Sequence, residues 1–185
     1  MDILVSAFLG IGLAAAVGFR IFLPFLFMSL AAQFGLMEFS SGFEWIGTSV
    51  ALILFGTASI VEILAYYIPW FDNLLDSITA PLAMVCGSLV MASTMVEMEP
   101  WIKWTLAVIA GGGTAGLIKG TSTTTRAVSS VTTAGLGNSL VATIEAVGSA
   151  ALSVLSIFIP VLAVLVVLVL VLLIVRKLWH FRSSP

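Results

Sequence analysis

The chain has 185 residues, of which 61% are hydrophobic and only 9% are charged, and its formal net charge is -2. Soluble domains carry about 25% charged residues, so this composition excludes an ordinary soluble protein and predicts a membrane protein. Uncharged apolar runs of 18 or more residues point the same way, and the clearest of them covers residues 146–175. We therefore expect the lipid bilayer as a partner and no nucleic acid.

Cysteine and histidine are each present once, which excludes several kinds of chemistry. Cys86 lies in an apolar segment, so the chain has no disulfide framework and no thiolate metal site. His180 lies in the basic tail, which argues against zinc sites and histidine acid–base catalysis. We expect no metal, no cofactor and no enzymatic activity. Because the chain begins Met-Asp without a basic segment, we expect the first apolar stretch to be retained.

The first of six predicted hydrophobic segments covers residues 3–34 and is too long for one straight span. It contains Arg20 and Pro24. Because proline removes a backbone hydrogen bond and kinks a helix, we expect a broken helix or a re-entrant pair here. Arg20 must then pair, line a cavity or reach the interface.

The other five segments are predicted from apolar runs over residues 45–69, 81–98, 101–120, 138–160 and 161–178. Trp45 and Trp70 flank the second segment as interfacial aromatic residues. The stretch WFDNLLDSITAP that follows has apolar residues on one helical face and Asp72 and Asp76 on the other. This pattern predicts a short interfacial helix over residues 70–80.

The orientation follows from lysine and arginine, which favour cytoplasmic loops. Three cations follow the last segment: Arg176, Lys177 and Arg182. The C-terminus is therefore expected in the cytoplasm, and six spans would place the N-terminus there too. The expected loops then hold Lys119 and Arg126 inside and Lys103 outside. If the first segment forms two spans, the N-terminus moves outside.

Two stretches of the chain resemble each other and indicate an internal repeat. VALILFGTASIVEILAYYIPWF begins at Val50, and VATIEAVGSAALSVLSIFIPVL begins at Val141. Both open Val-Ala, contain a central glycine and reach Ile-Pro at the same spacing. We therefore expect two inverted three-helix units, residues 1–98 and 99–178, with a basic cytoplasmic tail over residues 179–185. In such proteins the binding site lies between the repeats near the membrane midplane.

The inversion places Glu62 and Glu145 at one depth. Each lies seven residues from the expected cytoplasmic end of its helix, which is roughly 10 Å at the rise of an α-helix. Intramembrane acids are costly and commonly functional. Glu62 has two interpretations: a proton or cation relay, or a structural ion pair with Lys119, Arg126 or Arg20.

The order and spacing of several polar, proline and glycine residues also resemble a known family. VEILAYYIPWFDNLLDSITAPLAMVCG carries Glu62, Pro69, Asp72, Asp76, Pro81 and Gly87, and IKGTSTTTRAVSSVTTAGLGNSLVATIE carries Lys119, Arg126, Asn138 and Glu145. Over residues 10–175 this pattern resembles a bacterial family of small integral membrane proteins catalogued as a domain of unknown function. The resemblance implies a multi-pass protein of the bacterial cytoplasmic (inner) membrane and no particular activity. Tyr66-Tyr67 departs from the Asp-Lys that the family often has.

The candidate solute- or ion-binding residues are the polar groups in and beside the apolar segments: Arg20, Glu62, Lys119, Thr121, Arg126, Asn138 and Glu145. Asp72 and Asp76 are one helical turn apart and either share a cation or form the polar face of the interfacial helix. GTSTTTR, residues 120–126, is interpreted either as an anion contact or as a solvated turn.

Three functions remain open from the sequence. A small transporter or channel-like protein would attract an anion with Arg20, Lys119 and Arg126 and exchange protons at Glu62 and Glu145. A non-catalytic assembly or accessory protein, with homo-oligomers formed through small-residue faces, is the alternative. An enzyme acting on a lipid phosphate is least favoured, because the body of the chain lacks histidine.

Overall fold

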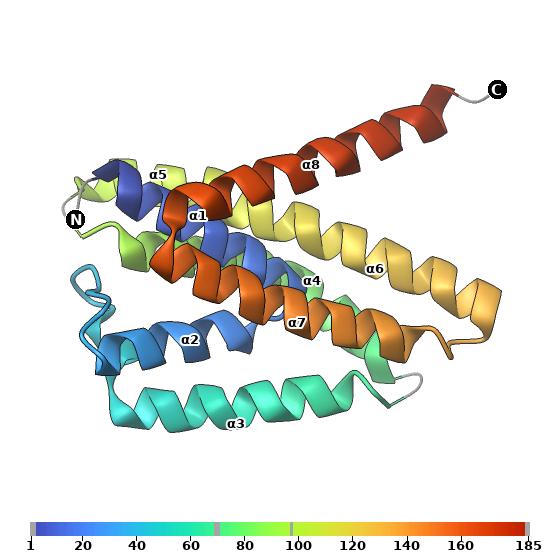
Figure 1. The fold of residues 1–185 in the computed structure, drawn as a ribbon, viewed down its shortest axis with the longest axis horizontal. Helices are drawn as coiled ribbons and strands as arrows, with labels where there is room; N and C mark the ends of the chain where they lie inside the picture. Colours follow the sequence, from blue (N-terminus) through green and yellow to red (C-terminus); the bar gives the residue numbers. More distant parts are fainter. Residues whose placement is uncertain (1–2, 69–70, 97, 184–185) are drawn as a thin grey trace.

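The computed structural model describes residues 3–68, 71–96 and 98–183. Within these ranges the fold is all-helical (Figure 1). The elements are α1 Ile3–Phe19, α2 Phe22–Gln33, η1 Glu44–Gly47, α3 Ser49–Ala65, α4 Phe71–Thr94, α5 Pro100–Leu106, η2 Ala107–Gly112, α6 Gly113–Thr133, α7 Asn138–Phe158 and α8 Pro160–Ser183. Pro69 and Trp70, near the end of the repeated stretch that begins at Val50, lie outside the described residues.

The distribution of apolar and charged side chains between the surface and the interior is typical of a membrane protein. Leu74–Thr94, Pro100–Thr133 and Asn138–Phe158 are each long and apolar enough to cross a membrane. Large apolar side chains such as Ile53 and Leu140 are more than 60% exposed, whereas Arg126 is fully buried. Exposed apolar surface around buried charge is the reverse of the arrangement in soluble proteins, and it indicates membrane association.

The predicted break in the first segment is present, and Pro24 explains its position. Helix α1 ends at Phe19 and α2 begins at Phe22. A proline lacks the N–H that would bond to the carbonyl four residues earlier, and its ring clashes with that carbonyl. For Pro24 that carbonyl belongs to Arg20, where the helix stops. Pro24 itself lies in the first turn of α2, where proline is tolerated.

Helices α1 and α2 form a hairpin rather than one continuous helix. Thr94 Oγ1, at the end of α4, donates to the carbonyl of Ser6 at 3.1 Å. The amide of Ser40, which follows α2, donates to the carbonyl of Ser93 at 2.8 Å. Both ends of the hairpin therefore lie at the same end of the molecule, opposite the C-terminus (Figure 1).

The expected short helix over residues 70–80 is instead the first part of α4, which runs continuously over Phe71–Thr94. Pro81 lies inside α4 and does not end it. Asp72 and Asp76 are only 2% and 3% exposed. The amphipathic pattern predicts the helix correctly, and the two aspartates on its polar face meet side chains of other helices.

Residues 120–126 also differ from the expected turn, because they lie in the middle of α6. Thr121 and Thr125 donate their hydroxyls to the carbonyls four residues earlier, at 2.9 Å each. Such bonds satisfy hydroxyls inside a helix. The hydroxyl-rich sequence is thus compatible with a helix that continues to Thr133.

Helix α1 lies at the centre of the fold and packs against α4, α6, α7 and α8, so the predicted halves share one core. Their packing is not equivalent: α3 packs mainly against α2 and η1, whereas its expected counterpart α7 packs against α1, α2, α6 and α8.

Helix α4 meets the π-helical segment η2 through two glycines. A Cβ atom at Gly87 would lie 2.5 Å from the Cβ of Ala115 and 2.8 Å from the carbonyl oxygen of Gly111. These neighbours are a packed helix and its backbone, which cannot move away independently. The contact therefore requires glycine.

We expect Gly87→Ala to lower the free energy of unfolding by about 1–3 kcal/mol, because overpacking a close helix contact forces the backbones apart. Gly120→Ala is the matched control, since nothing lies within 4 Å of a Cβ there. Alanine is the better helix former, so the control should keep or raise stability. Thermal unfolding in detergent micelles measures both, and equal melting temperatures would contradict the packing described.

Candidate functional site

A group of ionisable side chains is buried where the α1–α2 break meets the end of α3 and helices α4, α6 and α7. None of its members is more than 8% exposed. We call this group the buried charge network; it consists of Arg20, Glu62, Tyr66, Asp76, Lys119, Arg126 and Glu145. A single charge near the bilayer centre costs about 2.5–3.5 kcal/mol on insertion scales. Such residues are therefore expected to pair with one another.

Glu145 on α7 is the anion that two arginines share. Arg126 binds it with Nε at 3.3 Å and through a close Nη2 contact. Arg20 Nη2 lies 3.2 Å from the same carboxylate and also donates to the carbonyl of Ala142 at 3.0 Å. Ser122 donates its hydroxyl to Glu145 as well. Glu145 thus links the α1–α2 break to α6.

Asp76 on α4 forms the second ionic centre. Its Oδ1 accepts from Lys119 Nζ at 2.8 Å and from the Tyr66 hydroxyl at 2.9 Å. Its Oδ2 lies 3.7 Å from Arg126 Nε. The Tyr66 hydroxyl also accepts from Lys119 Nζ at 2.8 Å, so Tyr66, Lys119 and Asp76 contact one another. Arg126 therefore lies between the two carboxylates.

Tyr66 was not among the candidates, yet its ring contacts all three cations. The guanidinium carbons of Arg20 and Arg126 lie 3.8 and 4.4 Å from the ring centroid, and Lys119 Nζ lies 5.1 Å from it. Cations are attracted to the face of an aromatic ring, more strongly when both are desolvated. The only sequence signal was the Tyr66-Tyr67 departure from the family pattern.

Glu62 on α3 binds backbone and not a cation. Its two carboxylate oxygens accept from the amides of Ile21 at 2.9 Å and Phe22 at 3.0 Å. These amides have no carbonyl partner within α2, because the first turn of any helix leaves its N–H groups free. A negative charge is also favoured at this end of the helix dipole. Glu62 therefore stabilises the hairpin tip beside Arg20.

Asn138 at the start of α7 is hydrogen-bonded to Asp72, which lies one turn before Asp76 on α4. Asn138 Nδ2 donates to Asp72 Oδ2 at 2.6 Å and to Ser130 Oγ at 2.9 Å. Asp72 and Asp76 thus have different polar partners, and Asp76 is already neutralised by Lys119. Among the described residues no three His, Cys, Asp or Glu side chains gather as a metal site would require. Ion pairing explains Asp76 better than a shared cation.

Thr121 lies outside the network, because its exposed hydroxyl bonds only to Leu117. Ser122, one residue later, faces Glu145 instead. Lys119 and Arg126 are buried in α6, so they cannot count as loop cations. The orientation argument then rests on the three tail cations against Lys103, which donates to Ser40 at the other end.

Several polar atoms of the network are buried without a hydrogen-bond partner. They are Arg20 Nε and Nη1, Arg126 Nη1 and Asp76 Oδ2, with Asn138 Oδ1 next to them. Buried donors and acceptors are nearly always paired, and leaving one unpaired costs about 1–3 kcal/mol. The guanidinium groups thus keep hydrogen-bonding capacity beyond what Glu145 and Ala142 use.

Comparison with known proteins identifies the family. Residues 7–180 match the model of the domain of unknown function DUF4126. The chain belongs to this family. Neither the curated proteins nor the solved structures contain a match. The family resemblance expected from the polar positions is confirmed, and the buried charge network of this DUF4126 chain includes five of them: Glu62, Asp76, Lys119, Arg126 and Glu145.

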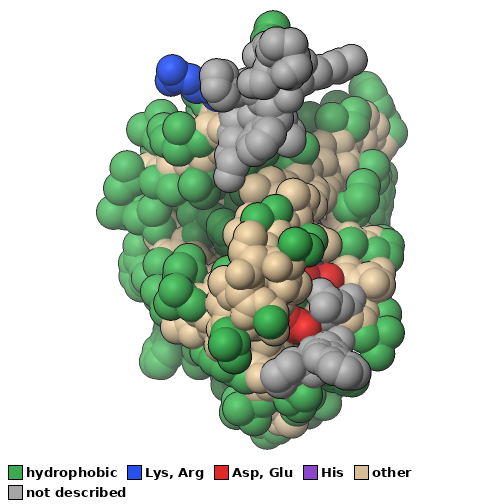
Figure 2. All heavy atoms as spheres, turned by 90° about the vertical axis from the view of Figure 1, so that its right-hand side faces the viewer, with side chains coloured by type: hydrophobic (Ala, Val, Ile, Leu, Met, Phe, Trp, Pro, Cys, Tyr) green, Lys and Arg blue, Asp and Glu red, His purple; other side chains and the backbone are tan. Residues whose placement is uncertain are grey.

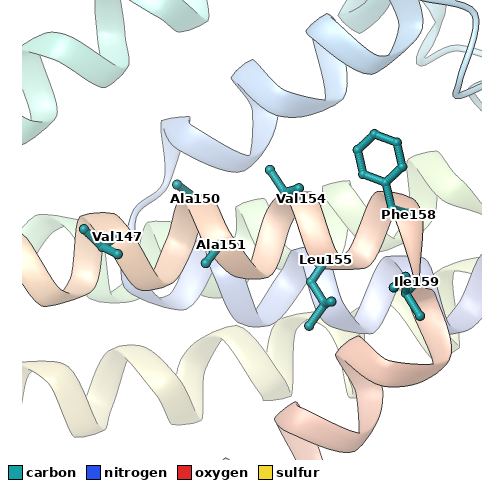
Figure 3. A pocket seen from close by; sticks show the side chains of 7 residues that line it. All are labelled: Val147, Ala150, Ala151, Val154, Leu155, Phe158 and Ile159. Carbon is teal, nitrogen blue, oxygen red and sulfur yellow. The ribbon is translucent and has the colours of Figure 1, made fainter.

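A groove on α7 lies apart from the network. It has a volume of about 630 Å³ and is lined by Val147, Ala150, Ala151, Val154, Leu155, Phe158 and Ile159 (Figure 3). These residues are all apolar and include no member of the network. In a DUF4126 protein within a bilayer, such a surface suits a lipid chain and has no group that recognises a polar solute.

We expect Glu62→Gln to loosen the hairpin tip, because a glutamine offers one acceptor oxygen to two backbone amides. Hydrogen bonds to charged groups contribute about 1.5–3 kcal/mol, so amide exchange over residues 20–23 should accelerate at least about tenfold. Hydrogen–deuterium exchange with mass spectrometry measures this.

Glu44→Gln is the matched control, since Glu44 accepts from the amide of Gly42 in an exposed turn. It should leave exchange over residues 20–23 unchanged. Identical exchange there in the wild type and Glu62→Gln would show that Glu62 does not hold the tip.

Proposed function

We propose that this protein moves a small anion across a membrane together with protons, using the buried charge network as the solute site. The observation that carries the proposal is the pair of fully buried arginines, Arg20 and Arg126, whose remaining N–H groups have no partner. Three cations are gathered in an apolar bundle at considerable cost. A shared role in binding an anion accounts for that arrangement.

The geometry explains how an anion would be recognised. Arginine N–H groups bind carboxylates and oxyanions through directional, charge-assisted hydrogen bonds. Glu145 already occupies one edge of Arg126 in this way. The protein's own carboxylates therefore hold the position of a bound anion, and a solute would compete with them for the same donors.

This competition provides the coupling to protons. A protonated carboxyl loses its negative charge and releases its attraction for arginine. The cations would then favour the solute anion, and departure of the proton would restore the internal ion pairs. Anion and proton would thus travel together.

We place the protein in a bacterial cytoplasmic membrane with a cytoplasmic C-terminus, as its tail cations favour. Helices α3, α4, α5–α6, α7 and α8 would cross, and the α1–α2 hairpin would enter and return. This gives five crossings in place of six, with the N-terminus outside. Helix α2, with 12 residues, spans about 18 Å at the rise of an α-helix, which is too short for a bilayer core of about 30 Å.

The arrangement of the chain as two inverted units remains a prediction. Helices α3 and α7 run in opposite directions (Figure 1), as inversion requires. The network draws residues from both units, in agreement with a site between them. Because α3 and α7 pack against different sets of helices, the two units correspond in the direction of these helices but not in their packing.

An assembly protein without a solute is the second candidate. Gly113 and Gly120 on α6 have nothing within 4 Å of a Cβ, so this face could admit a close helix of another copy. The network would then serve only to hold the helices together. A lipid-phosphate enzyme stays the least favoured, and we propose that the protein is not an enzyme.

We expect proteoliposomes containing the wild type to acidify internally when chloride, phosphate or succinate is imposed outside, as read by an enclosed pH-sensitive dye. Arg126→Gln should slow acidification at least about tenfold, because the solute loses its central cation. For at least one of the three anions the wild type should exceed empty vesicles.

Lys103→Gln is the matched control, because it also removes a cation but lies outside the network, bound to Ser40. It should transport within about twofold of the wild type. Acidification by the wild type no faster than in empty vesicles, for all three anions, would end the transport proposal.

A further inference from the structure

The three carboxylates of the network differ in how fully their oxygen atoms are used. Both oxygens of Glu62 accept backbone amides. Both oxygens of Glu145 accept from Arg126, and Ser122 and Arg20 add further contacts. Neither Glu62 nor Glu145 therefore has an oxygen atom without a hydrogen bond.

Asp76 is different because all its hydrogen bonds fall on one oxygen. Tyr66 and Lys119 both donate to Oδ1. Oδ2 is buried with no hydrogen bond, and Arg126 Nε lies 3.7 Å away. A proton can therefore bind Oδ2 without displacing a hydrogen-bond donor, and the neutral carboxyl that results holds Lys119 less strongly than the carboxylate does. The side chain is 3% exposed, so the unused oxygen faces protein and not bulk water.

The charges around Asp76 come from every element packed there. Lys119 and Arg126 project from α6, the phenol of Tyr66 follows α3, and Asp72 precedes Asp76 by one turn of α4. Glu145 on α7 reaches the same place through Arg126. Asp76 thus lies between two cations on one side and two carboxylates on the other. An anion that binds Lys119 and Arg126 would compete with Asp76 for the same two cations.

Asp76 also lies toward one end of the molecule. It belongs to the first half of α4, at the end of the molecule that carries the C-terminus (Figure 1). Figure 2 views this end and shows acidic side-chain atoms reaching the surface in small patches. A proton from the proposed cytoplasmic side would meet this part of α4 before the α1–α2 break.

We propose that Asp76 is the proton-accepting group of the network: it takes a proton at Oδ2 and thereby frees Lys119 and Arg126 for the solute anion. This inference rests on the proposed function and names its coupling residue. The step is a simple protonation, in which the carboxylate and a proton form a neutral carboxylic acid. When the proton leaves, the carboxylate regains both cations.

The test uses infrared spectroscopy on the full chain in lipid nanodiscs, titrated over about pH 4 to 9. A protonated carboxylic acid adds a C=O stretching band that a carboxylate lacks. Incorporating aspartate labelled with ¹³C at its carboxyl should shift this band, and labelled glutamate should not. The chain has only three aspartates, Asp2, Asp72 and Asp76. A band that shifts with the aspartate label must therefore come from one of these three residues.

Asp76→Asn should then remove the buried band, while the matched control Asp72→Asn should retain it. A band that follows the glutamate label, survives Asp76→Asn, or never forms in this pH range overturns the inference. Because the titration needs no transport, it separates the two claims. An Asp76 band in a protein whose vesicles show no flux defeats the proposed function, whereas flux without an Asp76 band defeats the coupling residue.

Discussion

The constraint on which this structure depends is the cost of charge in an apolar bundle. The three cations and three carboxylates of the buried charge network lie at 8% exposure or less, where an unpaired ion would be strongly destabilising. They are accommodated because each meets a counter-ion, a backbone dipole or an aromatic face. Removing one member would leave the others uncompensated, so the positions of α1, α4, α6 and α7 depend on one another.

The break between α1 and α2 is the place where several of these buried charges meet. Pro24 prevents the helix from continuing past Arg20, and the break frees the two amides that Glu62 binds. Arg20 is then directed to Glu145 on α7, while Glu62 holds the adjacent backbone from α3. One proline thus creates both a donor site for a carboxylate and a turning point at which an arginine stays buried. The same place joins the two halves of the chain.

The sequence was sufficient to predict the class of fold and most of the network. The apolar runs predict a helical membrane protein, and Arg20 and Pro24 predict the break in the first segment. The cost of polar groups within apolar segments points to Arg20, Glu62, Lys119, Arg126 and Glu145 as candidates. Asp76 was assigned to an interfacial helix, because the pattern of an amphipathic helix is the same whether its polar face meets water or a buried lysine.

Other features depended on information that a single sequence does not contain. Ser122 and not Thr121 faces Glu145, and this choice requires the helical phase of a stretch that reads equally well as a turn. Tyr66 contacts three cations only because the end of α3 packs over the α1–α2 break, a tertiary contact between distant segments. Whether the first segment would span or return was left open by the sequence for the same reason, since the return of α2 depends on its packing against α3.

The most direct test of the ionic network is a double-mutant cycle on Arg126 and Glu145. Free energies of unfolding in mixed micelles would be measured for the wild type, Arg126→Met, Glu145→Gln and the double variant. Because each single change leaves a buried charge without its partner, the coupling energy should be about 2–3 kcal/mol, whereas Lys103→Gln with Glu145→Gln should be additive within about 0.5 kcal/mol. Additive effects of Arg126→Met and Glu145→Gln would contradict the network.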